Sequence, residues 1–435
     1  MNIRRIVKRL IPRRLFGSIE PFGHLLEAVF WQVVYGFPAR GLHIIGVTGT
    51  NGKTTSVFML HRMLNEAGLP VGMMSTVAYG VGENIMPQIH HMTTVPSREL
   101  LQRIRAMKRQ GMKWLVLETT SHALAQNRVW GIPYSIAVMT NLTHEHLDYH
   151  KTFERYRAAK VKLFELAASN RKGLRTGIVN ADDPSADYFV RAVPKSITYG
   201  VTAGDLRASD VKATPHGSEF TATYGEHKLH LRVRLPGSFN VSNALGVAAT
   251  GIAVGLSDEQ IEQGIAALEA VEGRMTTVDA GQQFSVIVDY AHTPDSFEKL
   301  FNDIKPVVKG RLIVMFGSAG RRDEAKRAVQ GRLAGESADE VVITEEDDRD
   351  CDGIAIMNEI AAGAEAAGKV RDKDLFLVHD RSEAIRFAIG RARAGDTVLL
   401  LGKGHEKTIE RADGEHPWDE AGTARAALEQ LRSSR

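Results

Sequence analysis

Apolar residues follow two different spacings that alternate along most of this chain. Short continuous apolar runs, typical of buried strands, are separated by longer stretches in which apolar residues recur at helical spacing. The alternation begins at Gly41 and predicts an α/β fold with mostly parallel sheets and helices on both faces. In the first half we expect strands at Leu42–Val47, Trp114–Glu118, Ser135–Thr140 and Thr176–Asn180, and helices at Lys53–Ala67, Ser242–Val254 and Asp258–Leu268.

Two further changes in the pattern divide the chain. Residues 197–236 contain short runs separated by Thr and Gly, which predict an antiparallel hairpin of Phe220–Tyr224 and Leu229–Leu235. After Gly273 the alternation starts afresh and predicts a second, doubly wound domain. Its expected strands are Phe284–Asp289, Arg311–Phe316, Glu340–Thr344, Leu375–Val378 and Thr397–Leu401. We therefore expect three regions, which are a basic amphipathic helical segment (1–40), a central domain (41–272) and a Rossmann-like carboxyl-terminal domain (273–435).

The amino-terminal segment is basic and amphipathic. Six Arg and Lys residues precede the first acidic residue, Glu20, and the apolar residues from Ile3 to Ile11 recur at helical spacing. A second apolar stretch, Phe22–Phe37, is interrupted by polar residues and is shorter than the roughly 20 apolar residues that a membrane span needs. Two interpretations stay open, and both can hold together: a helical hairpin packed on the first domain, and peripheral contact with an anionic membrane surface.

Composition and charge exclude several classes of protein. Of the 435 residues, 43% are hydrophobic and 25% are charged, which is typical of a globular protein and excludes a disordered tail. The single cysteine, Cys351, excludes an internal disulfide and a Cys-rich zinc site. The net charge of +3 is too small to favour nucleic acid as a partner of the whole surface.

One segment carries a specific phosphate-binding motif. Residues 46–54, GVTGTNGKT, match G-x-x-x-x-G-K-[ST] between a predicted strand and a predicted helix, which is the context that the motif requires. Glycines let backbone N–H groups turn toward phosphate oxygens, and the helix amino terminus adds partial positive charge. We therefore expect a P-loop ATPase fold for the central domain. The residues expected to bind ATP in this loop are Gly49, Thr50, Asn51, Gly52, Lys53, Thr54 and Thr55.

Polar residues follow the next two predicted strands. Glu118 ends one strand and is followed by Thr-Thr-Ser-His, and residues 140–150 after the other read TNLTHEHLDYH. Because ligands bind at the carboxyl ends of such strands, a carboxylate and an imidazole here are candidate metal ligands beside the phosphates. A His-rich loop taken alone is more often a polar surface segment, and it is the neighbouring phosphate loop that favours a metal site.

Several segments together resemble one enzyme family. The chain contains, in the family's order, the segments TGTNGKTT, ETTSHAL, TNLTHEHLDYH, YRAAK, LPGSFNVSNAL, GRM and DYAHTPD. In these segments the chain resembles the Mur ligases, the ATP-dependent amide ligases of peptidoglycan precursor synthesis. The resemblance runs from about residue 41 to the carboxyl end. It is greatest to the members that add the third amino acid, meso-diaminopimelate or L-lysine, to a UDP-N-acetylmuramoyl dipeptide.

The resemblance implies a chemistry and a set of residues for it. ATP phosphorylates a carboxylate, an amine attacks the acyl phosphate, and a tetrahedral intermediate collapses to an amide and phosphate. The implied catalytic residues are Lys53, Lys160 and His146, and the implied Mg²⁺ ligands are Thr54, Glu118, His146 and Lys160, the last as a carbamate formed with CO₂. Asn240 and Asn243 match residues on the adenine side of ATP, and Arg274, Asp289 and His292 match residues near the ribose and phosphates.

The resemblance also implies two substrate sites. The residues that match contacts to the nucleotide-sugar peptide are Thr93, Thr94, Ser121, Gln126 and Arg128, and those that match contacts to the incoming amino acid are Arg322, Asp347, Arg349, Gly402 and Glu406. Family members that add diaminopimelate carry Asp-Asn-Pro-Arg where this chain has Asp347, Asp348 and Arg349 after Glu346. The retained Arg favours a side-chain carboxylate, as in meso-diaminopimelate, whereas the two acids favour an amine, as in lysine.

The chain departs from the family at its amino-terminal end. About 40 residues precede the first strand, too few for the α/β domain that binds UDP in the usual enzyme. The acceptor is therefore left open between a UDP-linked dipeptide, a lipid-linked muropeptide, and a folyl- or polyglutamate chain. A catalytically inactive, membrane-associated scaffold is the alternative of another class. Use of ATP favours a cytoplasmic location, peripheral to the membrane if the amino-terminal segment binds it, and we expect a monomer.

Overall fold

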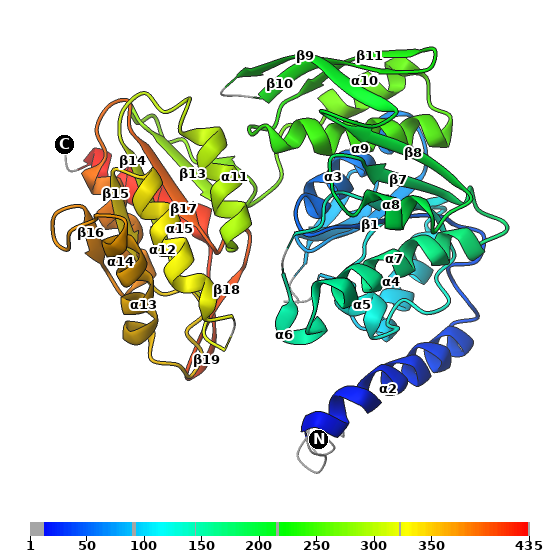
Figure 1. Cartoon of the computed structure of the whole chain (residues 1–435), viewed down its shortest axis with the longest axis horizontal. Helices are drawn as coiled ribbons and strands as arrows, with labels where there is room; N and C mark the ends of the chain where they lie inside the picture. Colours follow the sequence, from blue (N-terminus) through cyan, green and yellow to red (C-terminus); the bar gives the residue numbers. More distant parts are fainter. Residues whose placement is uncertain (1–12, 89–92, 144, 215–216, 322, 434–435) are drawn as a thin grey trace. The chain divides into compact units, whose positions relative to one another are not determined.

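The computed structural model describes residues 13–88, 93–143, 145–214, 217–321 and 323–433. The chain forms two compact units, each built around its own sheet (Figure 1). The first unit ends at Leu268 and the second runs from Glu269 to the carboxyl end, except that the short pieces 213–217 and 234–239 also belong to the second unit.

The first unit is built on an eleven-stranded sheet with a parallel centre. In spatial order its strands are β11 (His227–Val233), β10 (Gly217–Tyr224), β9 (Leu206–Thr214), β8 (Lys195–Gly200), β7 (Thr176–Asn180), β6 (Tyr134–Met139), β1 (His43–Thr48), β5 (Trp114–Glu118), β2 (Val71–Met74), β3 (Ala78–Val81) and β4 (Asn84–Pro87). β1 pairs in parallel with both β5 and β6, whereas β3–β4 and β10–β11 are antiparallel. The carboxyl ends of β1, β5 and β6 therefore meet at one edge of the sheet.

Helices cover both faces of this sheet. They are α2 (Arg13–Val34), α3 (Lys53–Glu66), α4 (Ser97–Arg109), α5 (Ser121–Ala125), α6 (Leu147–His150), α7 (Phe153–Ser169), α8 (Ala186–Val190), α9 (Phe239–Val254) and α10 (Asp258–Ala266). On one face, α4, α5, α7 and α8 share a buried core with strand residues such as Ile44 and Leu117. On the other face, α3 packs on β1, β5 and β2, and α10 packs on α3. The loops that leave β1, β5 and β6 lie between these layers.

The second unit is a smaller, doubly wound domain. In spatial order its strands are β12 (Thr276–Thr277), β13 (Ser285–Asp289), β17 (Thr397–Leu401), β14 (Leu312–Phe316), β15 (Glu340–Ile343) and β16 (Leu375–Leu377), beside a separate hairpin of β18 (Thr408–Arg411) and β19 (Gly414–Pro417). Its helices are α11 (Pro294–Ile304), α12 (Ala325–Ser337), α13 (Gly353–Ala366), α14 (Arg381–Arg391) and α15 (Glu420–Ser433). One core lies between the sheet and α11, α12 and α13, and another between the sheet and α14 and α15.

The predicted α/β fold and its parallel strands are confirmed, with bounds that differ by no more than one residue. The predicted hairpin is also confirmed as β10 and β11. The edge strands β2, β3 and β4 and the strands β8 and β9 were not predicted. Short strands such as Val71–Met74, with a single β-branched residue, carry too little apolar pattern to be recognised from sequence.

Most of the second apolar stretch of the amino-terminal segment lies in one helix, because α2 runs without a break through Arg13–Val34. The first stretch, Ile3–Ile11, lies outside the described residues, so the hairpin stays a prediction. Pro21, inside the helix, costs one hydrogen bond of its ladder. The later turns are held on the first unit, because Trp31 packs against its core and the Gln32 amide donates to the Trp130 carbonyl (2.9 Å). Residues 1–12 lie outside the described residues, and none of the described helices is long and apolar enough to cross a membrane.

A buried histidine makes the stability of the first unit depend on pH. His61, on α3, is 5% exposed, and burial lowers its pKa to about 4 against the opposing charge of Glu83. The unfolded chain takes up this proton near pH 6.5, so stability is fully present above pH 6.5 and is lost as the pH falls toward 4. The difference in pKa corresponds to a loss of about 3 kcal/mol.

We expect His61→Leu to reduce this loss. Urea unfolding between pH 7 and pH 4.5, followed by tryptophan fluorescence in a Trp418→Phe background, reports the first unit, which holds the other three tryptophans. An equal fall in stability in both proteins would contradict the assignment.

Candidate active site

The phosphate loop between β1 and α3 depends on two glycines. Gly49 (φ 152°) and Gly52 (φ 81°) have backbone conformations that side chains disfavour. A Cβ at Gly49 would overlap the hydroxyl of Thr140, and one at Gly52 would overlap the side-chain oxygen of Asn243. The loop therefore lies directly against the chain that follows β6 and against α9, and only glycine permits both approaches.

Residues after β6 hold the loop in shape. The Asn51 N–H donates to the Asn141 side-chain oxygen (2.9 Å), and the Asn51 carbonyl accepts from the Asn141 amide (3.0 Å) and from the Thr140 hydroxyl (2.6 Å). The Lys53 ammonium donates to the Thr50 carbonyl (2.7 Å), so it closes over the loop where phosphate oxygens would bind. These contacts between side chains and backbone give the loop the shape of a phosphate cradle.

Thr54 and Glu118 meet beside this cradle. The Thr54 hydroxyl donates to the Glu118 carboxylate (3.1 Å), which also accepts from the backbone N–H and the hydroxyl of Thr76 (3.0 Å each). A hydroxyl and a carboxylate are oxygen ligands that suit Mg²⁺, and they lie next to a phosphate loop. These two residues fit the predicted metal site, since an ion would replace only one hydrogen bond between them.

Lys160 lies in the interior of the site. α7 begins at Thr152, whose hydroxyl accepts from the Arg155 N–H (3.3 Å), and this helix carries the Lys160 side chain to the Gly49 carbonyl (2.6 Å). Burial, together with the charge of Lys53, lowers the pKa of Lys160 well below its ordinary value, against the opposing effect of Glu145 and Glu118. A buried amine with a lowered pKa is in part neutral and therefore nucleophilic.

His146 lies apart from the Thr54–Glu118 pair among the described contacts. Its side chain is 40% exposed, lies 3.7 Å from the Glu145 carboxylate, and packs edge-on against His122 (4.7 Å between ring centroids). The structure therefore places it in the loop after β6, in contact with the His122 imidazole, and its role as a metal ligand stays a prediction.

The predicted contacts to the nucleotide-sugar peptide form a chain of hydrogen bonds beside Glu118. The hydroxyls of Thr93 and Thr76 are hydrogen-bonded (3.0 Å), and the Thr94 hydroxyl donates to the Glu118 carbonyl (3.0 Å). Arg128 donates to the Thr94 carbonyl and to the Gln126 side chain. The fifth residue, Ser121, hydrogen-bonds to His150 (3.0 Å).

The expected nucleotide residues of α9 are buried next to the loop. Asn243 donates to the Asn240 side chain (2.9 Å) and lies against Gly52. Thr55, in the first turn of α3, is buried as well. The contact with Gly52 places Asn243 beside the phosphate loop, and the predicted adenine contact stays untested.

The second unit brings Arg274, Asp289 and His292 around one tyrosine. The Arg274 guanidinium lies over the Tyr290 ring (4.8 Å), and His292 Nδ1 lies 2.9 Å from the Tyr290 carbonyl. Asp289 accepts from the N–H groups of Met275 (2.7 Å) and Ala291 (2.8 Å). Burial raises the pKa of Asp289, against these hydrogen bonds and the charge of Arg274.

The predicted amino-acid site is an ion-pair network. The buried Lys403 ammonium contacts both Asp347 (2.8 Å) and Glu406 (2.6 Å). Burial would raise the pKa of Asp347, but the Lys403 charge and hydrogen bonds outweigh it and hold that pKa below its ordinary value. Arg349 pairs with Glu410 (2.7 Å) and donates to the Gly320 carbonyl (2.5 Å).

Glu346 is the unexpected member of this site. It is buried, one carboxylate oxygen has no hydrogen-bond partner among the described residues, and that oxygen faces Gly402, where a Cβ would come within 2.8 Å. Burial raises the pKa of Glu346, against the charges of Lys326 and Lys403. Arg322 was also expected in this region, but it lies outside the described residues.

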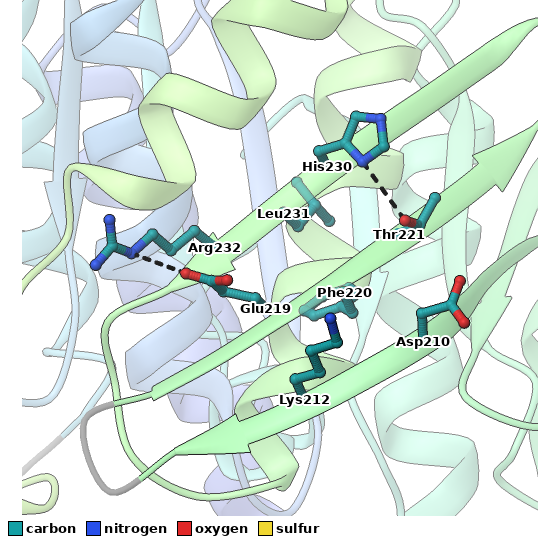
Figure 2. Close-up of a pocket in the computed structure, with 8 residues that line it drawn as sticks. All are labelled: Asp210, Lys212, Glu219, Phe220, Thr221, His230, Leu231 and Arg232. Atoms are coloured by element: carbon teal, nitrogen blue, oxygen red, sulfur yellow. Dashed lines mark hydrogen bonds and ion pairs between the residues drawn. The ribbon is translucent and has the colours of Figure 1, made fainter.

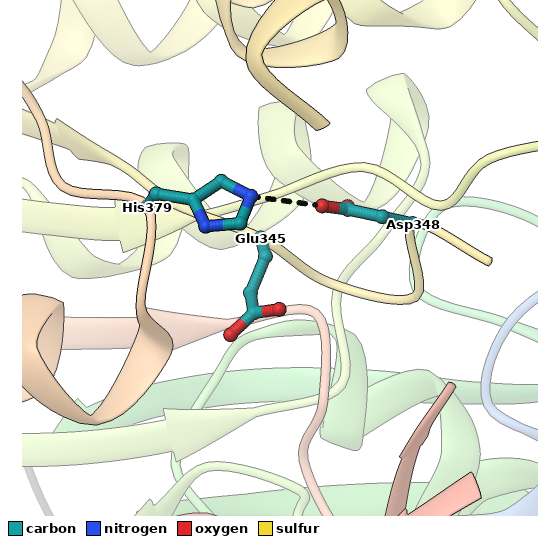
Figure 3. Close-up of side chains that lie close together, drawn as sticks. All are labelled: Glu345, Asp348 and His379. Carbon is teal, nitrogen blue, oxygen red and sulfur yellow. Dashed lines mark ion pairs between the residues drawn. The ribbon is translucent and has the colours of Figure 1, made fainter. Parts of the chain in front are cut away.

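Two other groups of polar side chains do not support a metal-binding or ligand-binding site. In the described part of the chain, the one cluster of three His and carboxylate ligands is Glu345, Asp348 and His379, drawn in Figure 3. Glu345 is already held by Arg411 (2.6 Å) and by the Arg381 N–H (3.2 Å), so a metal there would have to displace an ion pair.

The second group lies on the outer face of the β9–β11 sheet (Figure 2). Arg232 pairs with Glu219 (3.4 Å), and Thr221 contacts His230 (3.5 Å) across the strands. Both side chains of this pair are mostly exposed, and exposed ion pairs contribute little to the free energy of folding. Eight residues line this shallow depression, and they are Asp210, Lys212, Glu219, Phe220, Thr221, His230, Leu231 and Arg232.

Sequence reasoning missed several residues that complete the site. Thr76 supplies two of the hydrogen bonds to Glu118, and the Tyr156 hydroxyl contacts that of Thr50 (3.1 Å). Lys403 neutralises Asp347. Thr76 is a hydroxyl residue that follows β2, and this position would have marked it as a candidate if β2 had been predicted. Lys403 lies between two glycines after β17, and a polar residue after a predicted parallel strand is a candidate ligand contact.

Comparison with known proteins agrees with the geometry. The family model described as "Mur ligase middle domain" matches residues 47–251, and that described as "Mur ligase, glutamate ligase domain" matches residues 273–404. A UDP-N-acetylmuramyl-tripeptide synthetase of Roseiflexus sp. (strain RS-1) is 45% identical, over 91% of this chain and 80% of that protein. A UDP-N-acetylmuramoyl-L-alanyl-D-glutamate–2,6-diaminopimelate ligase of Geobacillus thermodenitrificans (strain NG80-2) is 38% identical, over 95% of this chain and 84% of that protein.

Solved structures are similar over the same length. A UDP-N-acetylmuramoyl-L-alanyl-D-glutamate–2,6-diaminopimelate ligase is 29% identical with a TM-score of 0.64, over 95% of this chain and 83% of that chain. A folylpolyglutamate synthase of Mycobacterium tuberculosis has a TM-score of 0.70 over 94% of both chains, but at 16% identity it shows a shared fold alone. With both family domains matched and relatives similar over most of their length, the chain belongs to the Mur ligase family, whose members are ATP-dependent ligases that use Mg²⁺.

Proposed function

We propose that the chain adds meso-diaminopimelate to the D-glutamate carboxylate of a UDP-N-acetylmuramoyl dipeptide, at the expense of ATP. Relatives named as diaminopimelate ligases and tripeptide synthetases support this reaction. The observation that carries it is the buried Lys160 amine on the Gly49 carbonyl of the phosphate loop, next to the Thr54–Glu118 pair. A site of this kind suits transfer of the γ-phosphoryl group to a carboxylate. Dependence on ATP favours a cytoplasmic location.

The chain's own residues position and neutralise the reacting groups. The loop N–H groups and Lys53 hold the phosphates, and Thr54 and Glu118 would hold Mg²⁺, which when bound neutralises phosphate charge. The dipeptide carboxylate takes the γ-phosphoryl group and becomes an acyl phosphate. The amine of the second substrate then attacks the acyl carbon, and phosphate leaves as the amide forms.

We further propose that Lys160 acts as a carbamate. A neutral amine attacks the carbon of CO₂, a C–N bond forms, and loss of one amine proton to solvent leaves a carbamate anion; the lowered pKa of Lys160 favours the neutral amine. An unmodified ammonium beside Mg²⁺ would be repelled, whereas a carbamate would be attracted to it. The exchange of a cation for an anion would also relieve the repulsion by Lys53.

The ion pairs of the second unit favour diaminopimelate over lysine. Asp347 is neutralised by Lys403, and Asp348 lies 3.3 Å from His379. Because both carboxylates already have a partner within the protein, they attract a substrate amine less strongly. Arg349 contacts Glu410 through Nε and Gly320 through one terminal nitrogen. Its second terminal nitrogen supplies the charge-assisted hydrogen bond that a side-chain carboxylate needs.

The reaction itself is tested by phosphate release. Purified protein with ATP, Mg²⁺ and UDP-N-acetylmuramoyl-L-alanyl-D-glutamate is expected to release phosphate with meso-diaminopimelate, and the product mass should match the tripeptide. Lys53→Met should lower the rate about a hundredfold or more, because it removes charge from the phosphates, whereas the exposed Lys172→Met should not. Release without any acceptor, or only with a lipid-linked or folyl acceptor, would contradict the proposed substrate.

Lys160 is tested by its response to CO₂. Lys160→Ala should lose about a hundredfold in rate, and wild-type activity should fall in CO₂-depleted buffer and return with bicarbonate, because only a carbamate requires it. Isotopically labelled bicarbonate should give a carbamate NMR signal that is absent from Lys160→Ala. If activity is unchanged by bicarbonate and no signal is seen, Lys160 acts as the free amine.

Arg349 is tested by the Michaelis constant for the amino acid. Arg349→Ala should raise the KM for meso-diaminopimelate roughly 10- to 100-fold and leave the KM for ATP unchanged, since one charge-assisted hydrogen bond is lost. Glu410→Gln breaks the same ion pair but keeps the guanidinium, so it should retain the wild-type KM. An equal increase in both variants would mean that Arg349 acts only through its pair with Glu410.

A further inference from the structure

The amino-terminal helix α2 presents an unusual surface to solvent. Between Glu20 and Val34, every side chain that is exposed is apolar, and the exposed fractions run from 51% to 71%. These residues are Phe22, Leu26, Phe30, Val33 and Val34. Their spacing of four, four, three and one places them on one side of the helix. We call these five residues the apolar face of α2.

From Glu20 onward, the polar side chains of α2 are partly or fully covered. Gln32 is fully buried and donates to the Trp130 carbonyl, while His24 lies between Glu20 (3.9 Å) and Glu27 (3.7 Å) with its ring largely covered. Trp31 packs against the core, with the Arg98 guanidinium over its ring (4.8 Å). The helix, dark blue in Figure 1, packs on α4 of the first unit, and its polar and aromatic side makes the contacts named above. The five residues of the apolar face are more than half exposed.

The charge next to this face indicates what covers it. The sequence up to Glu20 has six basic residues and no acidic one, namely Arg4, Arg5, Lys8, Arg9, Arg13 and Arg14. An apolar partner protein would require the apolar face but not this run of positive charge. An anionic membrane surface requires both, since apolar side chains enter the acyl boundary while Lys and Arg meet the headgroups.

We propose that α2 binds to the surface of an anionic lipid membrane through its apolar face, and that the basic charge of the sequence up to Glu20 strengthens this binding. The helix would lie in the plane of the interface, because none of the described helices is apolar and long enough to cross a membrane. Each basic residue near the surface adds to the attraction, and salt screens it. The proposal does not depend on which acceptor the enzyme uses.

Vesicle sedimentation with the full chain tests the proposal. Vesicles of phosphatidylglycerol and phosphatidylcholine are compared with vesicles of phosphatidylcholine alone. The test variant is Phe22→Ser/Leu26→Ser/Phe30→Ser, and the matched control is Val307→Ser/Ile354→Ser, which removes exposed apolar side chains of the second unit. Circular dichroism and ligase rate without vesicles verify that each variant folds, since all changed residues are exposed and lie outside the proposed active site. A further variant replaces Arg4, Arg5, Lys8 and Arg9 by Gln.

Wild type and control are expected to sediment with the anionic vesicles, and the serine variant to bind roughly tenfold more weakly or not at all. The glutamine variant and high salt should also weaken binding, since both reduce the attraction to the headgroups. Failure of the wild type to bind anionic vesicles would overturn the proposal, as would equal binding by the serine variant or equal binding to neutral vesicles. A dimer that the serine substitutions dissociate, without vesicle binding, would assign the apolar face to a second copy of the chain.

Discussion

The close approach of the phosphate loop to the chain after β6 is the constraint on which the first unit's site depends. Gly49 lies so near the Thr140 hydroxyl that no side chain fits, and Asn51 is held by both Thr140 and Asn141. This contact connects the ends of β1 and β6 and so fixes where the loop N–H groups point. It also leaves the Gly49 carbonyl facing inward, where Lys160 reaches it. A larger residue at Gly49 would therefore displace the loop, the strand end and the lysine together.

The two lysines of the first unit's site place positive charge next to the phosphate loop, where it suits a phosphate-bearing ligand. The charge of Lys53 adds to the effect of burial in lowering the pKa of Lys160, and Glu118 accepts hydrogen bonds from the hydroxyl of Thr54 and from the hydroxyl and N–H of Thr76. Lys53 and the loop N–H groups are held where they can donate to phosphate oxygens, which is the preorganisation that phosphoryl transfer requires.

In the second unit, buried positive charges lie next to buried carboxylates. Its buried charges are already paired, Lys403 with Asp347 and Glu406, and Arg381 with Glu420 (2.6 Å). These pairs hold the ends of β17 and of the loop after β15 in one geometry. Glu346 is the exception, because one of its buried oxygens has no hydrogen-bond partner among the described residues. That oxygen lies so close to Gly402 that a side chain there would collide with it.

The sequence by itself determined the elements whose causes are local. The strand–loop–helix at residues 43–66, the parallel strands and the hairpin follow from apolar spacing and glycine position over a few neighbouring residues. Thr54 and Glu118 were found because each lies in or follows such an element, whereas Lys160 was found through the family resemblance of its segment. Only the tertiary structure decided which side chains meet: that Thr76 binds Glu118, that Lys403 neutralises Asp347, and that the apolar face of α2 points to solvent. Periodicity shows that a helix has an apolar side, but which side is covered depends on the packing of residues far apart in the chain.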